Sequence, residues 1–167
     1  MARSLRVAVI GAGLGGLAAA CALRRRGIEA VLYERASQLG EVGAGIQLGP
    51  NAVKVLRALG IEQPLLPLAS EPASYASLAW NDGRLRYREP MKGPYAAQFG
   101  APYLMTHRAD LHRQFCNQLP DSAVHLGMRC TGVANRNGAA VATFDGGAEI
   151  EADVIIGAER TLALFDG

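Results

Sequence analysis

The chain has 167 residues, of which half are hydrophobic and 19% are charged, and 20 are glycine. This length allows one domain with a sizeable core, and the composition is that of a folded α/β protein, which excludes a disordered or fibrous chain. The net charge is only +2, with 17 basic and 15 acidic residues interspersed, so the chain lacks the basic surface of a nucleic-acid-binding protein.

The three cysteines, Cys21, Cys116 and Cys130, form no CxxC motif and no cluster with histidine. A sparse, odd number of cysteines favours a reduced protein and gives no pattern for a metal site. The first apolar segment begins within a few residues of Met1, and no apolar run approaches the ~18–20 residues that span a bilayer. We therefore expect a cytoplasmic protein with no membrane, nucleic-acid or metal partner.

The N-terminal part predicts a strand, a glycine turn, a helix and a second strand. Leu5–Ile10 is a short apolar run typical of a buried strand, and it leads directly into Gly11-Ala-Gly13-Leu-Gly15-Gly16. Alanine and leucine predict a helix from Leu14 to Arg26, and Gly27 is a suitable residue to end it. Ile28–Glu34 is expected to be the second strand, which completes a βαβ unit.

The next segments alternate between glycine-rich stretches and short periodic elements. Residues 40–50 are glycine-rich and predict a loop that passes a ligand. Asn51–Leu59 predicts a helix, with Asn51 as its N-cap and Gly60 as its end. Ser74–Glu89 predicts two strands joined by a turn at Asn81-Asp82-Gly83, with Trp80 packing on the sheet together with Tyr75 and Tyr87.

The C-terminal part predicts a helix followed by several short strands. The helix extends from Arg108 to Leu119, after a short extended piece at Tyr103–Thr106. The strands are expected at Ala123–Leu126, Arg129–Asn135, Ala139–Phe144, Ala148–Glu151 and Asp153–Gly157. The predicted fold class is α/β: a Rossmann-type parallel sheet with a β-meander crossover and a partial second β layer. Residues 1–70 and 107–158 would form the nucleotide-binding domain, and 71–106 a fragment of a second domain.

The glycine turn is the motif that carries chemistry. In the pattern GxGxxG, Gly11 allows the sharp turn after the strand, Gly13 lets the backbone approach a pyrophosphate, and Gly16 lets the helix pack closely. The N–H groups at the start of the helix then face the anion. Glu34, at the end of the second strand, would accept hydrogen bonds from both hydroxyls of an adenosine ribose, and it disfavours a 2′-phosphate. The alternative is a structural glycine turn with Glu34 facing solvent.

The segments after this unit carry a specific resemblance. With Glu34-Arg35-Ala36, then residues 43–52 (GAGIQLGPNA), then His107-Arg108-Ala-Asp-Leu111, the sequence resembles the single-component flavoprotein aromatic hydroxylases from about Val7 to Ala158. These are FAD-dependent monooxygenases of the salicylate hydroxylase and 3-hydroxybenzoate 6-hydroxylase type. The resemblance implies FAD as cofactor, NAD(P)H and O2 as co-substrates, and a small phenolic substrate.

The resemblance also implies which residues contact FAD. The pyrophosphate would lie at the glycine turn, and the adenosine ribose would bind Glu34 with Arg35 beside the adenosine. Arg108 would reach the phosphates and the ribityl chain. The adenine would lie by the backbone of Cys130, and residues 45–48 would border the flavin ring. The implied contacts are Gly11, Gly13, Leu14, Gly15, Gly16, Glu34, Arg35, Gly45, Gln47, Arg108 and Cys130, with no catalytic residue among them. Simpler alternatives are that Arg108 pairs with Asp110, and that Gln47 only fixes its own segment.

The family pattern breaks near the C-terminus. The family has Asp-Gly after the last strand, a motif that helps to bind FAD and the nicotinamide reductant, whereas this sequence has Glu159-Arg160 and an atypical tail over 159–167. We therefore expect a chain truncated before the catalytic half, inactive alone and prone to self-association through edges exposed at 71–106. The alternative functions are a non-catalytic nucleotide-binding fragment, or part of another flavoprotein oxidoreductase.

Overall fold

The computed structural model describes residues 5–40 and 44–159 of the chain. It divides into two compact units, one made of Met1–Glu41 with Phe115–Gly167 and the other of Val42–Gln114. The fold is α/β, as expected. The assignment of 1–70 with 107–158 to cofactor binding and of 71–106 to a second domain remains a prediction, as does any role for the tail, of which 160–167 lie outside the described residues.

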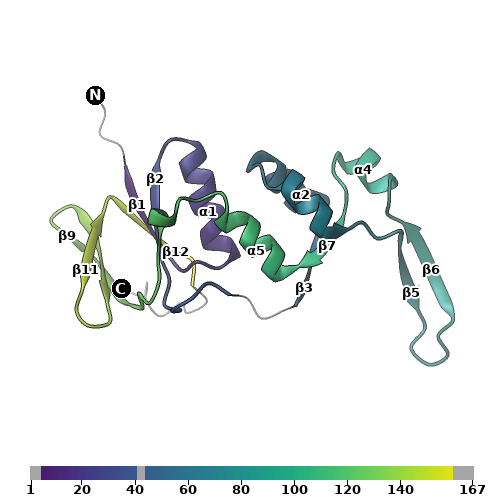
Figure 1. Ribbon diagram of the computed structural model, residues 1–167. Coiled ribbons are helices and arrows are strands. Elements are labelled where there is room, and N and C mark those ends of the chain that lie inside the picture. Colours follow the sequence, from purple (N-terminus) through teal and green to yellow (C-terminus); the bar gives the residue numbers. More distant parts are fainter. Residues whose placement is uncertain (1–4, 41–43, 160–167) are drawn as a thin grey trace. The chain divides into compact units, whose positions relative to one another are not determined.

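The first unit is built on a four-stranded parallel sheet (Figure 1). Its strand order is β12-β1-β2-β8, and β1 pairs in parallel with both β12 and β2. Helix α1 packs against β1 and β2 and buries Leu17, Ala20 and Cys21. The elements are β1 (Arg6–Ile10), α1 (Leu14–Arg25), β2 (Glu29–Tyr33), a 3-10 turn (Asp121–Ala123), β8 (Val124–His125) and β12 (Val154–Gly157). The βαβ unit expected from the N-terminal sequence is therefore confirmed.

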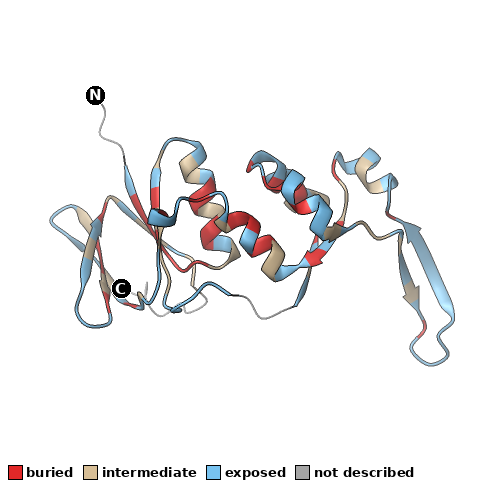
Figure 2. Cartoon of the chain, in the orientation of Figure 1, coloured by how far each residue is buried: buried red, intermediate tan, exposed pale blue. Residues whose placement is uncertain are grey.

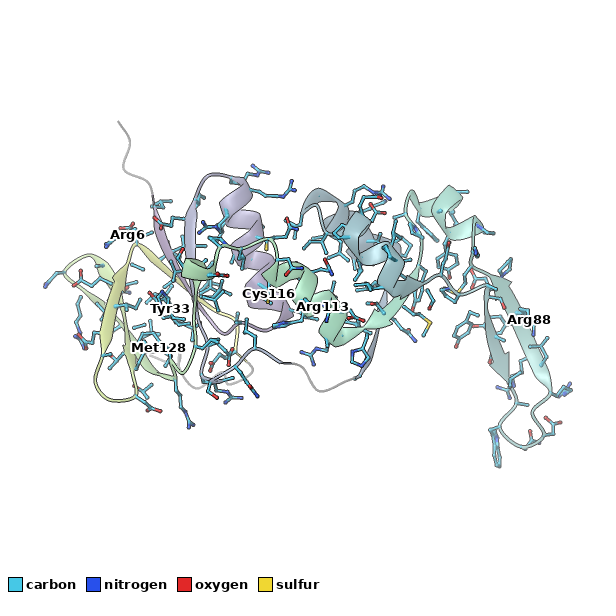
Figure 3. All side chains as sticks on the ribbon, in the orientation of Figure 1. Arg6, Tyr33, Arg88, Arg113, Cys116 and Met128 are labelled. Atoms are coloured by element: carbon cyan, nitrogen blue, oxygen red, sulfur yellow. The ribbon has the colours of Figure 1, made fainter. Side chains whose placement is uncertain are left out.

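A three-stranded antiparallel meander lies between β8 and β12 in the chain. It consists of β9 (Cys130–Arg136), β10 (Ala139–Phe144) and β11 (Glu149–Ala152), in the order β11-β10-β9. Its inner side chains form a core with β1, in which Ile10 packs with Cys130, Ala142 and Phe144. Tyr33 and Met128, both labelled in Figure 3, pack against this cluster. The predicted meander is confirmed.

The second unit contains a small antiparallel sheet in the order β3-β7-β4. The prediction of a loop over residues 40–50 is wrong for its second half, because Gly45–Leu48 pairs with Leu104–His107 as an antiparallel strand. The predicted helix at Arg108 is confirmed but ends at Cys116, three residues early. The elements are β3 (Gly45–Leu48), α2 (Pro50–Ala58), α3 (Glu62–Leu65), a 3-10 turn (Leu66–Leu68), β4 (Ala69–Ser70), α4 (Pro94–Phe99), β7 (Leu104–His107) and α5 (Arg108–Cys116), whose last two residues belong to the first unit.

The start of α2 differs from the sequence-based expectation. Asn51 is not its N-cap, because the helix begins one residue earlier at Pro50 and the cap position is Gly49. Proline suits the first helical position, since its φ is already helical and its missing N–H would have no helical partner there. The other end agrees with the prediction: Gly60 has a φ of +73°, the left-handed conformation that ends a helix.

The hairpin of β5 (Ser74–Leu78) and β6 (Leu85–Pro90) forms a two-stranded sheet of its own within the second unit. Its turn at Asn81-Asp82-Gly83 is confirmed. The prediction that Trp80 packs on this sheet is wrong, because Trp80 is 93% exposed beyond the end of β5. Tyr75 and Tyr87 do pack together, with ring centroids 5.7 Å apart. Figure 2 shows that both strands of the hairpin are largely exposed.

Candidate functional site

The glycine turn after β1 has a backbone that requires glycine at two positions. Gly11 has a φ of +105°, and its N–H donates to the carbonyl oxygen of Tyr33 at 2.8 Å. At Gly16, a Cβ would lie 2.0 Å from the carbonyl oxygen of Gly11 and 3.2 Å from the Cβ of Ala158. Any side chain at Gly16 would therefore push α1 away from the turn and from the end of β12.

The other two glycines of the turn, Gly13 and Gly15, face open space. A Cβ on Gly13 or Gly15 would meet no atom within 4 Å. Gly13 is the N-cap of α1, no side chain caps this helix end, and its first turn carries no acidic residue. The first N–H groups of a helix have no partner within the helix and attract an anion. The turn thus fits a pyrophosphate.

Glu34 follows β2 and directs its carboxylate at the glycine turn. Its Oε2 accepts a hydrogen bond from the Ala12 N–H at 2.8 Å, and its Oε1 accepts one from the Ala36 N–H at 2.9 Å. The Glu34 backbone is held on both sides, since its N–H donates to the His125 carbonyl at 2.9 Å and its carbonyl accepts from the Met128 N–H at 2.8 Å. The carboxylate is therefore fixed beside the glycine turn by two backbone N–H groups.

Glu159 is a candidate site residue that the sequence analysis considered only as a departure from the family pattern. It follows β12, and its Cγ would lie 3.0 Å from a Cβ on Gly11. Its Oε1 is buried and has no hydrogen-bond partner among the described residues. A buried carboxylate oxygen without a donor indicates a missing partner. Its position at the carboxyl end of a strand beside β1, where ligands bind in such sheets, was the available signal.

Cys130 begins β9 and is buried in the meander core. Burial raises the pKa of its thiol above all, an interaction with the Gly132 backbone lowers it, and the Glu159 carboxylate raises it. A thiol with a raised pKa is a weak nucleophile at neutral pH. This environment agrees with a role for the Cys130 backbone and not for its sulfur.

The remaining predicted contacts belong to different units of the chain. Arg35 is exposed just after Glu34, in the first unit. Gly45, Gln47 and Arg108 belong to the second unit, which places Gly45 opposite His107 in the β3–β7 pair. The Arg108 N–H donates to the Ala44 carbonyl at 2.9 Å. Their contact with the cofactor remains a prediction.

Gln47 has a local partner within the second unit. Its Oε1 accepts a hydrogen bond from the Tyr103 hydroxyl at 2.5 Å, so the side chain joins β3 to the residue before β7. A shallow depression that is open to solvent lies beside Gly45 on the same sheet, lined also by Leu68, Thr106 and His107. The segment around Gly45 therefore combines a fixed backbone with open space.

The described ranges, 5–40 and 44–159, contain neither a cluster of metal ligands nor a membrane-spanning helix. These residues contain no group of three or more histidine, cysteine, aspartate or glutamate side chains able to hold a metal ion. In the same ranges, every helix is too short or too polar to cross a bilayer.

Comparisons with protein families, with curated proteins and with solved structures all lead to FAD-dependent proteins. Residues 4–159 match the model of the FAD binding domain. The chain is 43% identical to 3-amino-4-hydroxybenzoate 2-monooxygenase from Streptomyces cremeus, over 94% of this chain and 40% of that protein, and 42% identical to 6-hydroxynicotinate 3-monooxygenase from Pseudomonas fluorescens, over 94% and 41%. Its structure resembles that of HpxO from Klebsiella pneumoniae complexed with FAD and uric acid, with a TM-score of 0.82 at 26% identity, over 90% of this chain and 38% of that chain.

These matches confirm the resemblance to flavoprotein aromatic hydroxylases and the prediction of FAD as cofactor. The chain spans about 40% of the length of the curated relatives it matches. Both the glycine turn and Glu159 fall within the matched residues. The chain belongs to the FAD binding domain family.

Proposed function

We propose that this chain holds the ADP half of FAD, with the pyrophosphate at the N-terminus of α1 and the adenosine ribose on Glu34. The observation that carries the proposal is the 2.8 Å hydrogen bond from the Ala12 N–H to Glu34 Oε2. It places the carboxylate directly beside the turn that suits a pyrophosphate, and ribose and pyrophosphate are neighbouring groups in ADP. Each carboxylate oxygen keeps a further lone pair for a ribose hydroxyl.

Glu159 adds a second acceptor to this site. Its buried Oε1 has no donor among the described residues, and a hydroxyl group of the cofactor would supply one. We assign the further contacts to Arg35, Arg108, the Cys130 backbone, and the segment with Gly45 and Gln47. FAD supplies the redox chemistry when bound, and these residues bind and orient it.

For the complete protein, we propose hydroxylation of a small aromatic or heteroaromatic ring with NAD(P)H and O2. The support is that the two relatives named above are monooxygenases whose names specify a hydroxybenzoate and a hydroxynicotinate. No residue of this chain is assigned a catalytic role, so the chain alone is expected to be inactive. A cytoplasmic location is also proposed, because the chain has only three cysteines and their spacing gives no disulfide framework.

The nucleotide released from the denatured protein tests the cofactor, and calorimetric titration with FAD and with ADP tests the site. We expect Glu34→Ala to weaken both ligands by at least about ten-fold, because charge-assisted hydrogen bonds worth about 1.5–3 kcal/mol each are lost. Glu34→Gln keeps an acceptor for the Ala12 N–H but not the charge, and serves as the matched variant.

Thermal unfolding of the ligand-free variants separates binding from folding. If Glu34→Gln unfolds at the wild-type temperature but binds ADP more weakly, the carboxylate acts on the ligand. Unchanged binding of FAD and ADP by a folded Glu34→Ala protein would refute the assignment. A chain that neither releases nor takes up any flavin would instead favour a nucleotide-binding role without FAD.

A further inference from the structure

Two cysteines that are far apart in sequence meet where α1 contacts the end of α5. Cys21 lies in the second half of α1 and is only 4% exposed. Its Sγ contacts the carbonyl oxygen of Phe115 at 3.7 Å, within the distance of a weak thiol hydrogen bond. The Phe115 carbonyl belongs to the planar peptide unit that joins Phe115 to Cys116. The Cys21 sulfur therefore contacts the backbone that directly precedes the Cys116 Cα.

The two thiols differ in their exposure to solvent, and they interact electrostatically. Cys116 ends α5 and is half-buried, whereas Cys21 is buried (Figure 3 labels Cys116). Burial raises the pKa of Cys21 to about 11, with a further contribution from Cys116, and burial also raises the pKa of Cys116. An electrostatic effect of one thiol on the other requires them to be close. Both thiols are therefore protonated at neutral pH and react slowly there, and their reactivity rises with pH as the thiolates form.

We propose that Cys21 and Cys116 form a dithiol site that hydrogen peroxide closes to an intramolecular disulfide, slowly at neutral pH and faster as the pH rises. Cys116, the more exposed thiol, reacts first: its sulfur takes one oxygen atom from hydrogen peroxide, giving a sulfenic acid and releasing water. The Cys21 sulfur then attacks the Cys116 sulfur, the S–S bond forms, and the sulfenic oxygen leaves as a second water. The two thiols are oxidised by two electrons, and the peroxide is reduced.

The disulfide would join two helices through residues that are distant in the chain. A cross-link over so long a loop restricts the unfolded state and raises the temperature of unfolding. Cys21 lies in the second half of α1, away from the glycine turn at the start of that helix. The modification is therefore expected to stabilise the first unit without occupying the proposed nucleotide site.

The test treats the purified chain with hydrogen peroxide at about pH 7 and about pH 9, and maps its peptides by mass spectrometry without reduction. We expect one cross-linked product that joins the Cys21 and Cys116 peptides, with the loss of two hydrogen atoms. The temperature of unfolding should rise, and a thiol reductant should reverse both changes. Cys130 is the internal control, since its sulfur contacts Gly132 and it should stay alkylatable after denaturation.

Two variants test the order of the steps. In Cys21→Ser, the sulfenic acid on Cys116 has no resolving thiol and should be trapped by dimedone. In Cys116→Ser, peroxide should produce neither the cross-link nor dimedone labelling at Cys21. The proposal fails if Cys21 and Cys116 of the folded wild-type chain remain alkylatable after peroxide, if the cross-link forms only between two chains, or if the trapped sulfenic acid is on Cys21.

Discussion

Gly13 and Gly16 lie three residues apart in one turn, but only Gly13 has room beside its Cα for a side chain. A Cβ on Gly16 would lie 2.0 Å from the Gly11 carbonyl oxygen, whereas one on Gly13 would meet nothing within 4 Å. We therefore expect Gly16→Ala to lower the free energy of unfolding by about 3 kcal/mol or more, since a backbone atom cannot yield like a side chain. Denaturant titration measures this change.

Gly13→Ala is the matched control at the same turn. Gly13 has a φ of −70°, which alanine adopts without strain, so the stability of this variant should stay within about 1 kcal/mol of wild type. Its new methyl group occupies the space assigned to the pyrophosphate, and ADP affinity should fall at least about ten-fold. Equal stability of both variants, or wild-type ADP binding by Gly13→Ala, would contradict the assigned roles.

At the scale of elements, α2 and α3 are joined by an ion pair that extends to the segment after α4. Arg57 donates to both carboxylate oxygens of Glu62, at 2.5 and 2.8 Å, and to the carbonyl of Gly100 at 2.9 Å. The Arg57 guanidinium lowers the pKa of Glu62, through hydrogen bonding above all. A carboxyl whose pKa is lowered by folding stabilises the protein above its ordinary pKa, and this contribution is lost as the pH falls below about 4.5.

Glu62→Gln should therefore lower the temperature of unfolding at pH 7, and its difference from wild type should shrink as the pH approaches 3. The effect is moderate because half of the Arg57 side chain is exposed to solvent. Glu149→Gln is the control, since its pair with Arg136 is exposed on both sides. A Glu62→Gln deficit that is equal at both pH values would show that the ion pair is not its cause.

At the scale of the whole molecule, the exposed hairpin has one protected and one open edge. Strand β6 carries Arg88, labelled in Figure 3, and Pro90, which block pairing with another strand, whereas Ser74–Leu78 has neither charge nor proline. Among the described residues, β5 pairs only with β6. We therefore predict reversible, concentration-dependent self-association of this chain by antiparallel pairing of β5 with its copy.

Sedimentation velocity over a range of micromolar concentrations measures this association. Ala76→Lys places a charge at the centre of β5 and should shift the chain toward monomer, whereas Arg88→Lys keeps the charge of β6 and should leave association unchanged. A chain that is monomeric at every concentration would disprove the prediction. Equal association of both variants would show that β5 does not form the contact between chains.

The local elements of the fold could be predicted because their signals are local. The βαβ unit follows from apolar runs and glycine spacing, and the helix ends at Gly27 and Gly60 follow from the left-handed backbone, with φ of +74° and +73°, that glycine adopts without strain. The strand at Gly45–Leu48 could not be predicted, because its hydrogen bonds come from residues near 105 and its glycine-rich sequence has no strand periodicity of its own.

The sequence by itself determined the α/β class, the order of the elements, the glycine turn and the acidic residue at the end of the second strand. These depend on residue types and on short spacings along the chain, both of which can be read from the sequence itself. Only the tertiary structure decided that the Glu34 carboxylate reaches the Ala12 N–H, that Glu159 buries an oxygen without a described partner, and that Cys21 meets the end of α5. Each of these depends on segments distant in the chain, and their approach is set by the packing of the whole sheet and its helices, which no local pattern encodes.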